Sequence, residues 1–341
     1  MAEPGRTLRQ RYSALVCDLD GVVRRGPMPV TYAVERLVGY SDKVVYATNN
    51  ASLTADDVAT QLRGLGLLLD VAQVATSSQA GAAYLAATVP AGARVLAVGG
   101  PGVAAALTEV GLTAVRTLDD GGVVAVLQGY GPAVAAADLA EASYAIEAGA
   151  IWVATNTDRT LPTNRGVAPG NGALVEAVAT ATGLTATVVG KPEPALYRLA
   201  LEHLGQPAGS VLAIGDRLDT DILGAQRAGL ASLWVQTGVD DLVSLMRDPQ
   251  QTVPTHVGVD LRVLDEDVAP ATMSGGWWVS GDAKVRVDPD SGEVQVDTPA
   301  GTSANRLLEA GTRALVDLRF SGRRSAPVLE RAATQVMDIT R

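Results

Sequence analysis

The sequence predicts an α/β fold with a parallel sheet and, at its C-terminal end, a smaller α+β segment. Short apolar runs alternate with stretches of helical spacing from about Ser13 to Leu264, and this rhythm is typical of βαβ units. After Leu264 the rhythm gives way to alternating strands and two amphipathic helices. Hydrophobic residues make up 47% of the 341 residues and aromatic residues only 4%, so we expect a core of Val, Leu, Ile and Ala.

The first strand ends in two carboxylates. The apolar run 14–17 predicts a buried strand, and Asp18, Asp20 and Gly21 follow it. Side chains at i and i+2 of an extended segment point the same way, and ligands of open α/β sheets bind at the carboxyl ends of strands. Two such anions repel unless a cation or a shared proton relieves them, and Mg²⁺ is suited to that role. Taken alone, these residues also fit an ordinary strand-ending turn.

The later elements follow in order. Further core strands are predicted at 43–47, 74–76, 95–98, 123–128, 151–154, 186–189, 211–214 and 232–235. Helices are predicted at 31–40, from Thr54 onward, from 78 to about 88, at 195–204 and from 221 to about 228. The tail is expected to hold strands at 277–279, 284–287 and 293–296 and helices at 303–318 and 326–338. We find no internal repeat.

Polar residues follow four of these strands, and each meets one need of phosphoryl transfer. Asp18 is the candidate nucleophile, which would form an aspartyl phosphate, and Asp20 is the candidate general acid and base. Lys191 supplies a positive charge beside the phosphate. Asp216 completes the carboxylates around Mg²⁺, and Asp221 is placed to orient Lys191 or a metal-bound water.

The phosphate itself is expected to contact the end of the second strand. Thr48 offers a hydroxyl and Asn49 a backbone amide, and we include Asn50 in this phosphate-binding group.

Four ordered motifs resemble those of the haloacid dehalogenase (HAD) superfamily of phosphatases. They read Asp18-Leu-Asp-Gly-Val, Thr48-Asn-Asn, Gly190-Lys-Pro and Gly215-Asp followed by Thr220-Asp. The finer similarity is to the phosphoglycolate and 4-nitrophenyl phosphatase-like branch, although Ala51 stands where that branch often has Ser. The resemblance implies Mg²⁺ held by Asp18, the Asp20 backbone carbonyl and Asp216.

The resemblance also implies a domain organisation. We expect a doubly wound, Rossmann-like core in two segments, residues 13–80 and 183–264, with an inserted α/β cap at 81–182. Residues 265–341 form a C-terminal module outside the resemblance, for which we hypothesise a regulatory or oligomerisation role. Cap-loop residues Asn156, Asp158 and Arg165 are candidates for substrate contact or for plain surface chemistry.

The expected function is Mg²⁺-dependent hydrolysis of a small phosphorylated metabolite of the glycerol 3-phosphate or phosphoglycolate type. Pyridoxal phosphate or a nucleotide is the alternative substrate, and a phosphomutase is disfavoured because only about twenty residues separate the first two motifs, too few for the small cap of such enzymes. A non-catalytic, phosphometabolite-binding regulator is the alternative of another class.

Composition limits the partners. The net charge of −10 and the lack of a basic cluster argue against nucleic acid and anionic membranes. No apolar run could span a bilayer, and no signal peptide is evident. Because Cys17 is the only cysteine, we expect a cytoplasmic protein without an internal disulfide. A homo-oligomer through the cap or the C-terminal module is a further expectation.

Two other features have two interpretations each, and the two histidines argue against a metal site of another kind. Gly99-Gly-Pro-Gly102, with Asp119 and Asp120 downstream, nearly matches a dinucleotide-binding fingerprint, but a plain strand-turn-helix is favoured. Trp277-Trp278 suggests either ligand stacking or, preferably, a small hydrophobic core or a domain interface. His203 and His256 are too far apart in the sequence to suggest a zinc site.

Overall fold

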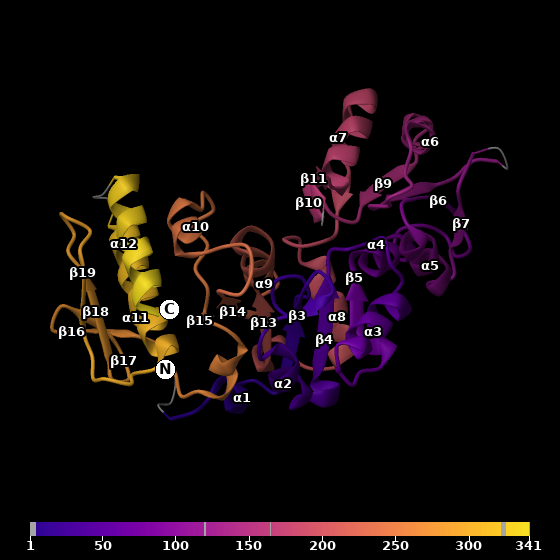
Figure 1. Ribbon diagram of the computed structural model, residues 1–341. Helices are drawn as coiled ribbons and strands as arrows, with labels where there is room; N and C mark the ends of the chain where they lie inside the picture. The colour runs from indigo at the N-terminus through magenta and orange to yellow at the C-terminus, as the bar shows by residue number, and fades with distance from the viewer. Residues whose placement is uncertain (1–4, 119–120, 164, 322–324, 341) are drawn as a thin grey trace. The chain divides into compact units, whose positions relative to one another are not determined.

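The computed structural model describes residues 5–118, 121–163, 165–321 and 325–340 (Figure 1). By the density of its internal contacts the chain divides into two units, Met1–Val44 with Gln206–Arg341, and Val45–Gly205. We describe each unit by itself. In the described residues, no helix is both long and apolar enough to cross a membrane.

The first unit contains a parallel sheet in the order β15-β14-β13-β1. Its strands are β1 (Ala14–Cys17), β13 (Val211–Gly215), β14 (Ala231–Val235) and β15 (His256–Gly258). Because Cys17 of β1 pairs with Ile214 of β13, the residues that follow these two strands emerge at the same edge. Both strands are fully buried, which explains their uninterrupted apolar runs.

Short helices and one hairpin complete this part of the unit. They are α1 (Leu8–Arg11), α2 (Ala33–Val38), α9 (Leu223–Arg227), α10 (Leu242–Arg247) and the hairpin β2 (Arg24–Arg25) and β3 (Met28–Pro29). The predicted helix from 221 to 228 is divided. A π-helical turn spans Leu218–Ile222 and α9 follows it. Such π turns are frequent at functional sites.

The C-terminal part of the first unit is an antiparallel meander covered by two helices. Its strands β16 (Thr272–Ser274), β17 (Trp277–Ser280), β18 (Ala283–Val287) and β19 (Val294–Asp297) pair in chain order. Helices α11 (Ala304–Phe320) and α12 (Ala326–Thr340) lie side by side, and α11 packs on β17 and β18 (Figure 1).

These two helices share a hydrophobic core with the parallel sheet of the same unit. Leu308, Leu315 and Val336 from the helices cluster with Trp234 and Leu245, all of them buried. The segment 265–341 was predicted as a separate module, yet its helices bury apolar surface that the preceding strands and α10 would otherwise expose. The boundary near Leu264 therefore stays a prediction.

The second unit holds two further parallel arrangements. Strand β4 (Val44–Thr48) enters it and pairs with β5 (Val74–Thr76). A five-stranded parallel sheet has the order β12-β9-β8-β6-β7. Its strands are β6 (Arg94–Val98), β7 (Thr113–Val115), β8 (Ala125–Gln128), β9 (Ile151–Ala154) and β12 (Thr187–Val188). A hairpin is formed by β10 (Thr160–Thr163) and β11 (Gly166–Pro169).

Among the residues described in this unit, six α-helices accompany these strands. They are α3 (Ala55–Gly64), α4 (Ser77–Ala86), α5 (Pro101–Glu109), α6 (Ala136–Glu147), α7 (Asn171–Thr182) and α8 (Ala195–Leu204). Helix α3 begins as the sequence predicts, because the Thr54 side chain accepts from Asp57 N and the Asp57 carboxylate accepts from Thr54 N. The predicted fold class, parallel α/β with an antiparallel C-terminal region, is confirmed.

Candidate active site

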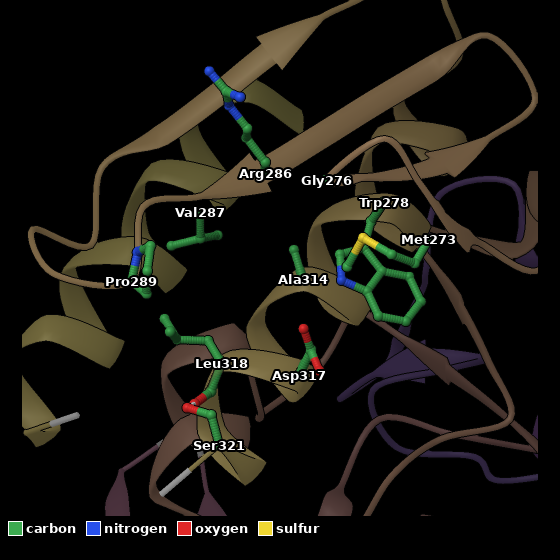
Figure 2. Close-up of a pocket in the computed structure, with 10 residues that line it drawn as sticks. All are labelled: Met273, Gly276, Trp278, Arg286, Val287, Pro289, Ala314, Asp317, Leu318 and Ser321. Atoms are coloured by element: carbon green, nitrogen blue, oxygen red, sulfur yellow. Dashed lines mark hydrogen bonds between the residues drawn. The ribbon is translucent and has the colours of Figure 1, made fainter. Parts of the chain in front are cut away.

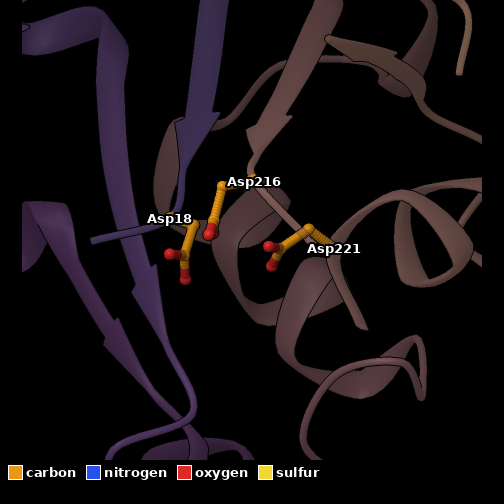
Figure 3. Close-up of side chains that lie close together, drawn as sticks. All are labelled: Asp18, Asp216 and Asp221. Carbon is orange, nitrogen blue, oxygen red and sulfur yellow. The ribbon is translucent and has the colours of Figure 1, made fainter. Parts of the chain in front are cut away.

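Three carboxylates converge in the first unit. One oxygen of each of Asp18, Asp216 and Asp221 lies within 4.8 Å of the others (Figure 3). Asp18 follows β1 and Asp216 follows β13, and Asp18 N donates to Ile214 O at 2.9 Å. The parallel register of β1 and β13 therefore brings together two of the predicted site residues that are almost two hundred positions apart in the chain.

Close backbone packing fixes the carboxylate of Asp216. The residue is completely buried, and Val239 N donates to its Oδ2 at 2.7 Å. A Cβ at Gly21 or at Gly238 would overlap this carboxylate. Gly21 also has a φ of +100°, which L side chains rarely adopt, and its carbonyl accepts from Thr237 Oγ1 at 2.7 Å. The loops that contain Gly21 and Gly238 leave room for the Asp216 carboxylate because neither glycine has a side chain.

Asp221 joins the cluster from the π-helical turn. It is buried, and its Oδ2 accepts from Arg217 N at 3.1 Å across the turn. The start of the turn is held by Asp240, whose Oδ2 accepts from Leu218 N at 2.8 Å and whose pKa is raised by burial. Asp221 was predicted to orient Lys191 or a metal-bound water, and the structure places it beside the predicted metal ligands.

The Asp20 side chain does not belong to this cluster. It is 59% exposed and forms an ion pair with Arg24, Oδ1 to Nε 3.1 Å. A tight turn explains this position, since Gly21 N donates to Arg24 O at 2.8 Å and carries the chain back on itself. The ligand implied by the family resemblance is the Asp20 backbone carbonyl rather than the side chain.

The donor set fits magnesium. Mg²⁺ prefers carboxylate oxygens at about 2.0–2.1 Å and keeps several waters, so two oxygens on one ion are at most about 4.2 Å apart. The three carboxylates are close to that span, and all three supply hard oxygen ligands of the kind that suits Mg²⁺. Asp18 and Asp216 are the side chains that would hold the ion, with Asp221 adjacent.

A second predicted group lies in the second unit, where the Asn49 side chain clamps the backbone of Lys191. Asn49 Oδ1 accepts from Lys191 N at 2.8 Å, and Asn49 Nδ2 donates to Lys191 O at 3.0 Å. Lys191 is buried, and its Nζ donates to Ala47 O at 3.2 Å, on the strand that leads to Thr48. The amide therefore fixes the lysine main chain at both its donor and its acceptor.

Thr48 and Asn50 shape the loop that carries Asn49. The Thr48 hydroxyl accepts from Asn50 N at 3.1 Å. The Asn50 Oδ1 accepts from both Ser52 N and Ser52 Oγ, at 2.9 and 2.7 Å. The side-chain oxygen of Asn50 stabilises the turn in this way, and its expected contact with phosphate stays a prediction.

Of the three cap-loop candidates, two contact the Asn49 loop. Asn156 Nδ2 donates to Asn49 O at 2.7 Å, and Asp158 Oδ2 accepts from Asn49 Nδ2 at 3.3 Å. Arg165 lies exposed in the β10–β11 hairpin, and the described residues show no contact between it and the Asn49 loop. The positioning role of Asn156 could not be inferred from the sequence, where it has only its place after a strand as a signal.

The glycine-rich turn at Gly99–Gly102 has a packing role. It caps the start of α5, and a Cβ at Gly100 or Gly102 would overlap the backbone of Ser52 or Leu53. The strand-turn-helix interpretation is therefore supported, and the glycines let the loop after Asn50 approach closely. Asp119 and Asp120, the acidic part of the fingerprint, lie outside the described residues.

Comparisons with known proteins agree with this arrangement. The model of the haloacid dehalogenase-like hydrolase family matches residues 15–113, and a HAD-hydrolase-like model matches residues 188–264. A D-glycerol 3-phosphate phosphatase of Mycobacterium tuberculosis is 44% identical over 279 residues, which are 80% of this chain and 77% of that protein. An acid sugar phosphatase of Staphylococcus aureus is 34% identical over 255 residues, 74% of this chain and 96% of that one.

Two solved structures extend the comparison. A glycerol phosphate phosphatase from M. tuberculosis in complex with magnesium has a TM-score of 0.81 and 39% identity, and the match covers 97% of this chain and 98% of that one. A p-nitrophenyl phosphatase from Archaeoglobus fulgidus has a TM-score of 0.68 and 27% identity, over 74% of this chain and 98% of that one. On the matched motifs, the ordered strand ends and these relatives, the chain belongs to the haloacid dehalogenase-like hydrolase family and is a phosphatase of that family.

Proposed function

We propose that this phosphatase hydrolyses glycerol 3-phosphate with Mg²⁺ as its cofactor. The observation that carries the proposal is the convergence of Asp18, Asp216 and Asp221 at the ends of β1 and β13. The name of the M. tuberculosis relative supports the choice of substrate, and the magnesium in the related structure supports the choice of metal.

The residues of this chain account for both halves of the hydrolysis. The Asp18 carboxylate attacks phosphorus, and the bond between phosphorus and the glycerol oxygen breaks as Asp20 protonates the leaving alkoxide. Asp20 then takes a proton from water, which attacks the aspartyl phosphate and releases inorganic phosphate and the free carboxylate. For these steps the ion pair of Asp20 with Arg24 has to open.

The remaining predicted residues are proposed to bind the phosphate group or the metal ion. The Thr48 hydroxyl, the Asn49 backbone amide and the Lys191 ammonium group are proposed to hold the phosphate oxygens. Mg²⁺, when bound by Asp18 and Asp216, offsets the negative charge of the phosphate and the carboxylates. The clamp of Asn49 on the Lys191 backbone supports this role, because it fixes the position of the lysine before substrate arrives.

Steady-state phosphate release from a panel of esters tests the substrate. The panel contains glycerol 3-phosphate, phosphoglycolate, a hexose phosphate, pyridoxal phosphate and a nucleotide, each with Mg²⁺ or with chelator. We expect the highest kcat/KM for glycerol 3-phosphate and loss of release with chelator. A preference for the hexose phosphate would favour the activity named for the staphylococcal relative, and release that survives chelation would contradict the metal dependence.

Two broader expectations also belong to this proposal. A small phosphorylated metabolite as substrate and the single buried cysteine, Cys17, support a cytoplasmic location. Homo-oligomerisation through the cap or the C-terminal module is tested by light scattering of the full chain, in which a monomeric mass would contradict it.

A further inference from the structure

The loop that leads from β14 into α10, residues 236–241, lies against the candidate metal site of the first unit. We call it the β14–α10 loop. Its Val239 N donates to Asp216 Oδ2 at 2.7 Å, and its Thr237 Oγ1 donates to Gly21 O at 2.7 Å. The loop therefore contacts both a carboxylate that would hold Mg²⁺ and the turn that follows β1.

Asp240 of the same loop holds the segment that carries the third carboxylate of the cluster. Its Oδ2 accepts from Leu218 N at 2.8 Å, where the π-helical turn Leu218–Ile222 begins. Backbone N–H groups at the start of a helix have no acceptor within it, so this bond fixes where the turn starts. Because Asp221 lies on the turn, Asp240 acts on the position of Asp221 without belonging to the cluster.

The β14–α10 loop depends on its two ends for its own position. Its one aliphatic side chain, Val239, is 67% exposed and gives the loop no buried anchor. At one end, Gln236 N donates to Gly258 O of β15 at 3.0 Å. At the other end, Asp241 Oδ1 accepts from Ser244 N at 2.9 Å and caps the first turn of α10. A displacement of α10 would therefore move the loop.

Helix α10 is too short to be stable by itself. It has six residues, and isolated helices of fewer than about 12–15 residues are marginal in water. Its buried side chains Leu242, Leu245 and Met246 cluster with residues of the C-terminal helices, among them Leu315 and Ala333. Helices α10 and α12 also pack directly on each other (Figure 1). The order of α10 therefore depends on α11 and α12.

Arg319, in the last turn of α11, holds the C-terminal end of α10. One of its terminal nitrogens donates to Leu245 O at 2.6 Å, and the other donates to Asp248 O. The last carbonyls of a helix have no donor within it, and a cation beside them is favourable. Asp317 and Ser321, on either side of Arg319 in the sequence, instead line a recess beside the meander (Figure 2). Arg319 thus joins the end of α11 to the end of α10.

A second polar contact of α10 is weaker. Arg247 pairs with Glu330 of α12, and both of its hydrogen bonds are 2.7 Å long. The Arg247 side chain is 63% exposed, and exposed ion pairs add little to stability. Of the two arginines, the part-buried Arg319 is therefore the stronger link between α10 and the C-terminal helices.

We propose that Asp240 and Arg319 are positioning residues of the Mg²⁺ site, and that the C-terminal helices thereby set its Mg²⁺ affinity. Arg319 and the shared hydrophobic core hold α10, α10 holds the β14–α10 loop, and the loop holds Asp216 and the π-helical turn. This inference rests on the proposed Mg²⁺ cofactor. It gives the segment 265–341 a role in metal binding although none of its residues would touch the metal.

Calorimetric titration of Mg²⁺ into the full chain, after removal of metal with a chelator and without substrate, measures the affinity directly. We expect Asp240→Ala to raise the Mg²⁺ Kd about 10- to 100-fold, as for other residues that orient metal ligands. Asp240→Asn keeps an oxygen acceptor for Leu218 N, so its Kd is expected to stay within about threefold of wild type. An equal rise in the two variants would contradict the role of this hydrogen bond.

Arg319→Met tests the link from α11 to α10. Met keeps an apolar chain and removes both bonds to the carbonyls of α10, and we expect the Mg²⁺ Kd to rise about 2- to 30-fold. Arg313→Met is the matched control. Arg313 also lies on α11 and donates to two carbonyls, Pro254 O and Thr255 O, at 3.0 and 2.8 Å, but these lie outside α10. This control should unfold at lower urea concentration with an unchanged Kd.

The double variant Asp240→Ala with Arg319→Met tests whether the two residues act along one route. If they do, the loss of Arg319 adds little once Asp240 no longer holds the turn. The Mg²⁺ Kd of the double variant is then expected to lie within about twofold of that of Asp240→Ala alone. A Kd that rises by the product of the two single effects would show independent action and overturn the shared route.

Two further results would overturn the proposal. One is a wild-type Mg²⁺ Kd in the Arg319→Met protein, and the other is an equal rise in the Arg313→Met and Arg319→Met proteins. Failure of the metal site itself has a different signature, which is a wild-type chain that binds no Mg²⁺ or an Asp216→Asn protein that binds it as wild type does. If Asp240→Ala does not fold, Arg319→Met and its control still decide.

Discussion

At the scale of single residues, several side chains of the site act by holding others in place. Asn49 fixes the backbone of Lys191, and Asn156 in turn donates to Asn49 O. Gly21 and Gly238 act through the space they leave for the carboxylate of Asp216. Such supporting contacts set how accurately the reacting groups are positioned.

Gly238→Ala tests the packing around Asp216. The added Cβ overlaps the Asp216 carboxylate, so we expect the Mg²⁺ concentration for half-maximal activity to rise about 10- to 100-fold. Gly209→Ala is the control, because a Cβ at Gly209 meets no other atom within 4 Å. Equal Mg²⁺ requirements in both variants would show that the carboxylate tolerates displacement.

Asn49→Ala tests the clamp on Lys191. Asn49→Ala removes two hydrogen bonds that hold the lysine backbone in place, which together contribute about 1–3 kcal/mol. If this free energy is lost from the stabilisation of the transition state, kcat falls roughly 5- to 150-fold. Asn305→Ala is the matched control. Asn305 is more buried than Asn49 and is also bonded on both sides of its amide, to Val259 N and Glu266 Oε1, at 2.8 and 2.9 Å. The control should lose stability at an unchanged kcat, and a parallel loss of kcat in both would contradict the role of Asn49.

His256 predicts a pH dependence of stability. Burial, with Arg11 and Arg313 nearby, lowers its pKa to about 4, while Tyr12 Oη lies 2.8 Å from its Nε2. An unfolded histidine has a pKa near 6.5, so the unfolded state binds more protons between pH 4 and 6.5. The free energy of unfolding therefore falls as the pH drops through this window, by up to about 3 kcal/mol.

Urea unfolding at several pH values measures this effect. His256→Gln is expected to flatten the dependence between pH 6.5 and 4 relative to wild type. His203→Gln is the control, since His203 is the other histidine of the chain and lies exposed on α8. If the free energy of unfolding of the His256→Gln protein depends on pH as steeply as that of wild type, other groups cause the acid sensitivity.

At the scale of elements, the sequence predicted the regular strands and missed the short or irregular ones. Ile151–Ala154 and Ala195–Leu204 have the predicted bounds, because their apolar patterns match the period of the element. The edge strand β7, the meander strand β16 and the short helix α10 were not predicted. They are three to six residues long, too short for a period to show, and neighbouring elements complete their hydrogen bonds or burial.

The predictions for the candidate site divide in a similar way, into residues that the sequence indicates and conformations that it does not. The sequence predicted Asp18, Asp216, Lys191 and Thr48 as site residues because each stands directly after an apolar strand or in a glycine-containing turn. The conformation of Asp20 and Asn50 could not be predicted, since it depends on local hydrogen bonds with Arg24 and Ser52.

Helix α11 connects the C-terminal meander to the parallel sheet of its unit. Leu315 is fully buried with Trp234 and Leu245, so Leu315→Ala is expected to lower the free energy of unfolding by about 2–5 kcal/mol. Phe320→Ala on the same helix, where the side chain is 51% exposed, should cost less than about 1 kcal/mol. Chemical denaturation measures both, and equal costs would contradict the shared core.

The same core makes a prediction for truncation after Leu264. Removal of α11 and α12 exposes the apolar surface of Trp234, Leu245 and Val257, so the shortened chain is expected to unfold at lower denaturant concentration or to aggregate. A truncated chain with unchanged mass in solution, stability and turnover would instead support an independent module without a role in catalysis.

At the scale of the whole molecule, coverage by relatives separates two parts of the chain. The M. tuberculosis structure matches 97% of it, whereas the A. fulgidus structure matches 74%. Between Ser13 and Leu264, four sequence motifs were enough to predict the family and the parallel α/β core. The C-terminal part carries no such motif, and its packing on the preceding sheet depends on contacts between residues far apart in the sequence.

The proposed mechanism depends above all on Asp18 as the nucleophile of this Mg²⁺-dependent phosphatase. Phosphate release from glycerol 3-phosphate by Asp18→Asn, beside wild type and Asp219→Asn, tests it most directly. Asp219 is an exposed carboxylate of the same edge that pairs with Arg217, so its variant should keep the wild-type rate. We expect Asp18→Asn to lose at least about 1,000-fold in kcat while remaining folded. A folded Asp18→Asn protein that releases phosphate at the wild-type rate would contradict it.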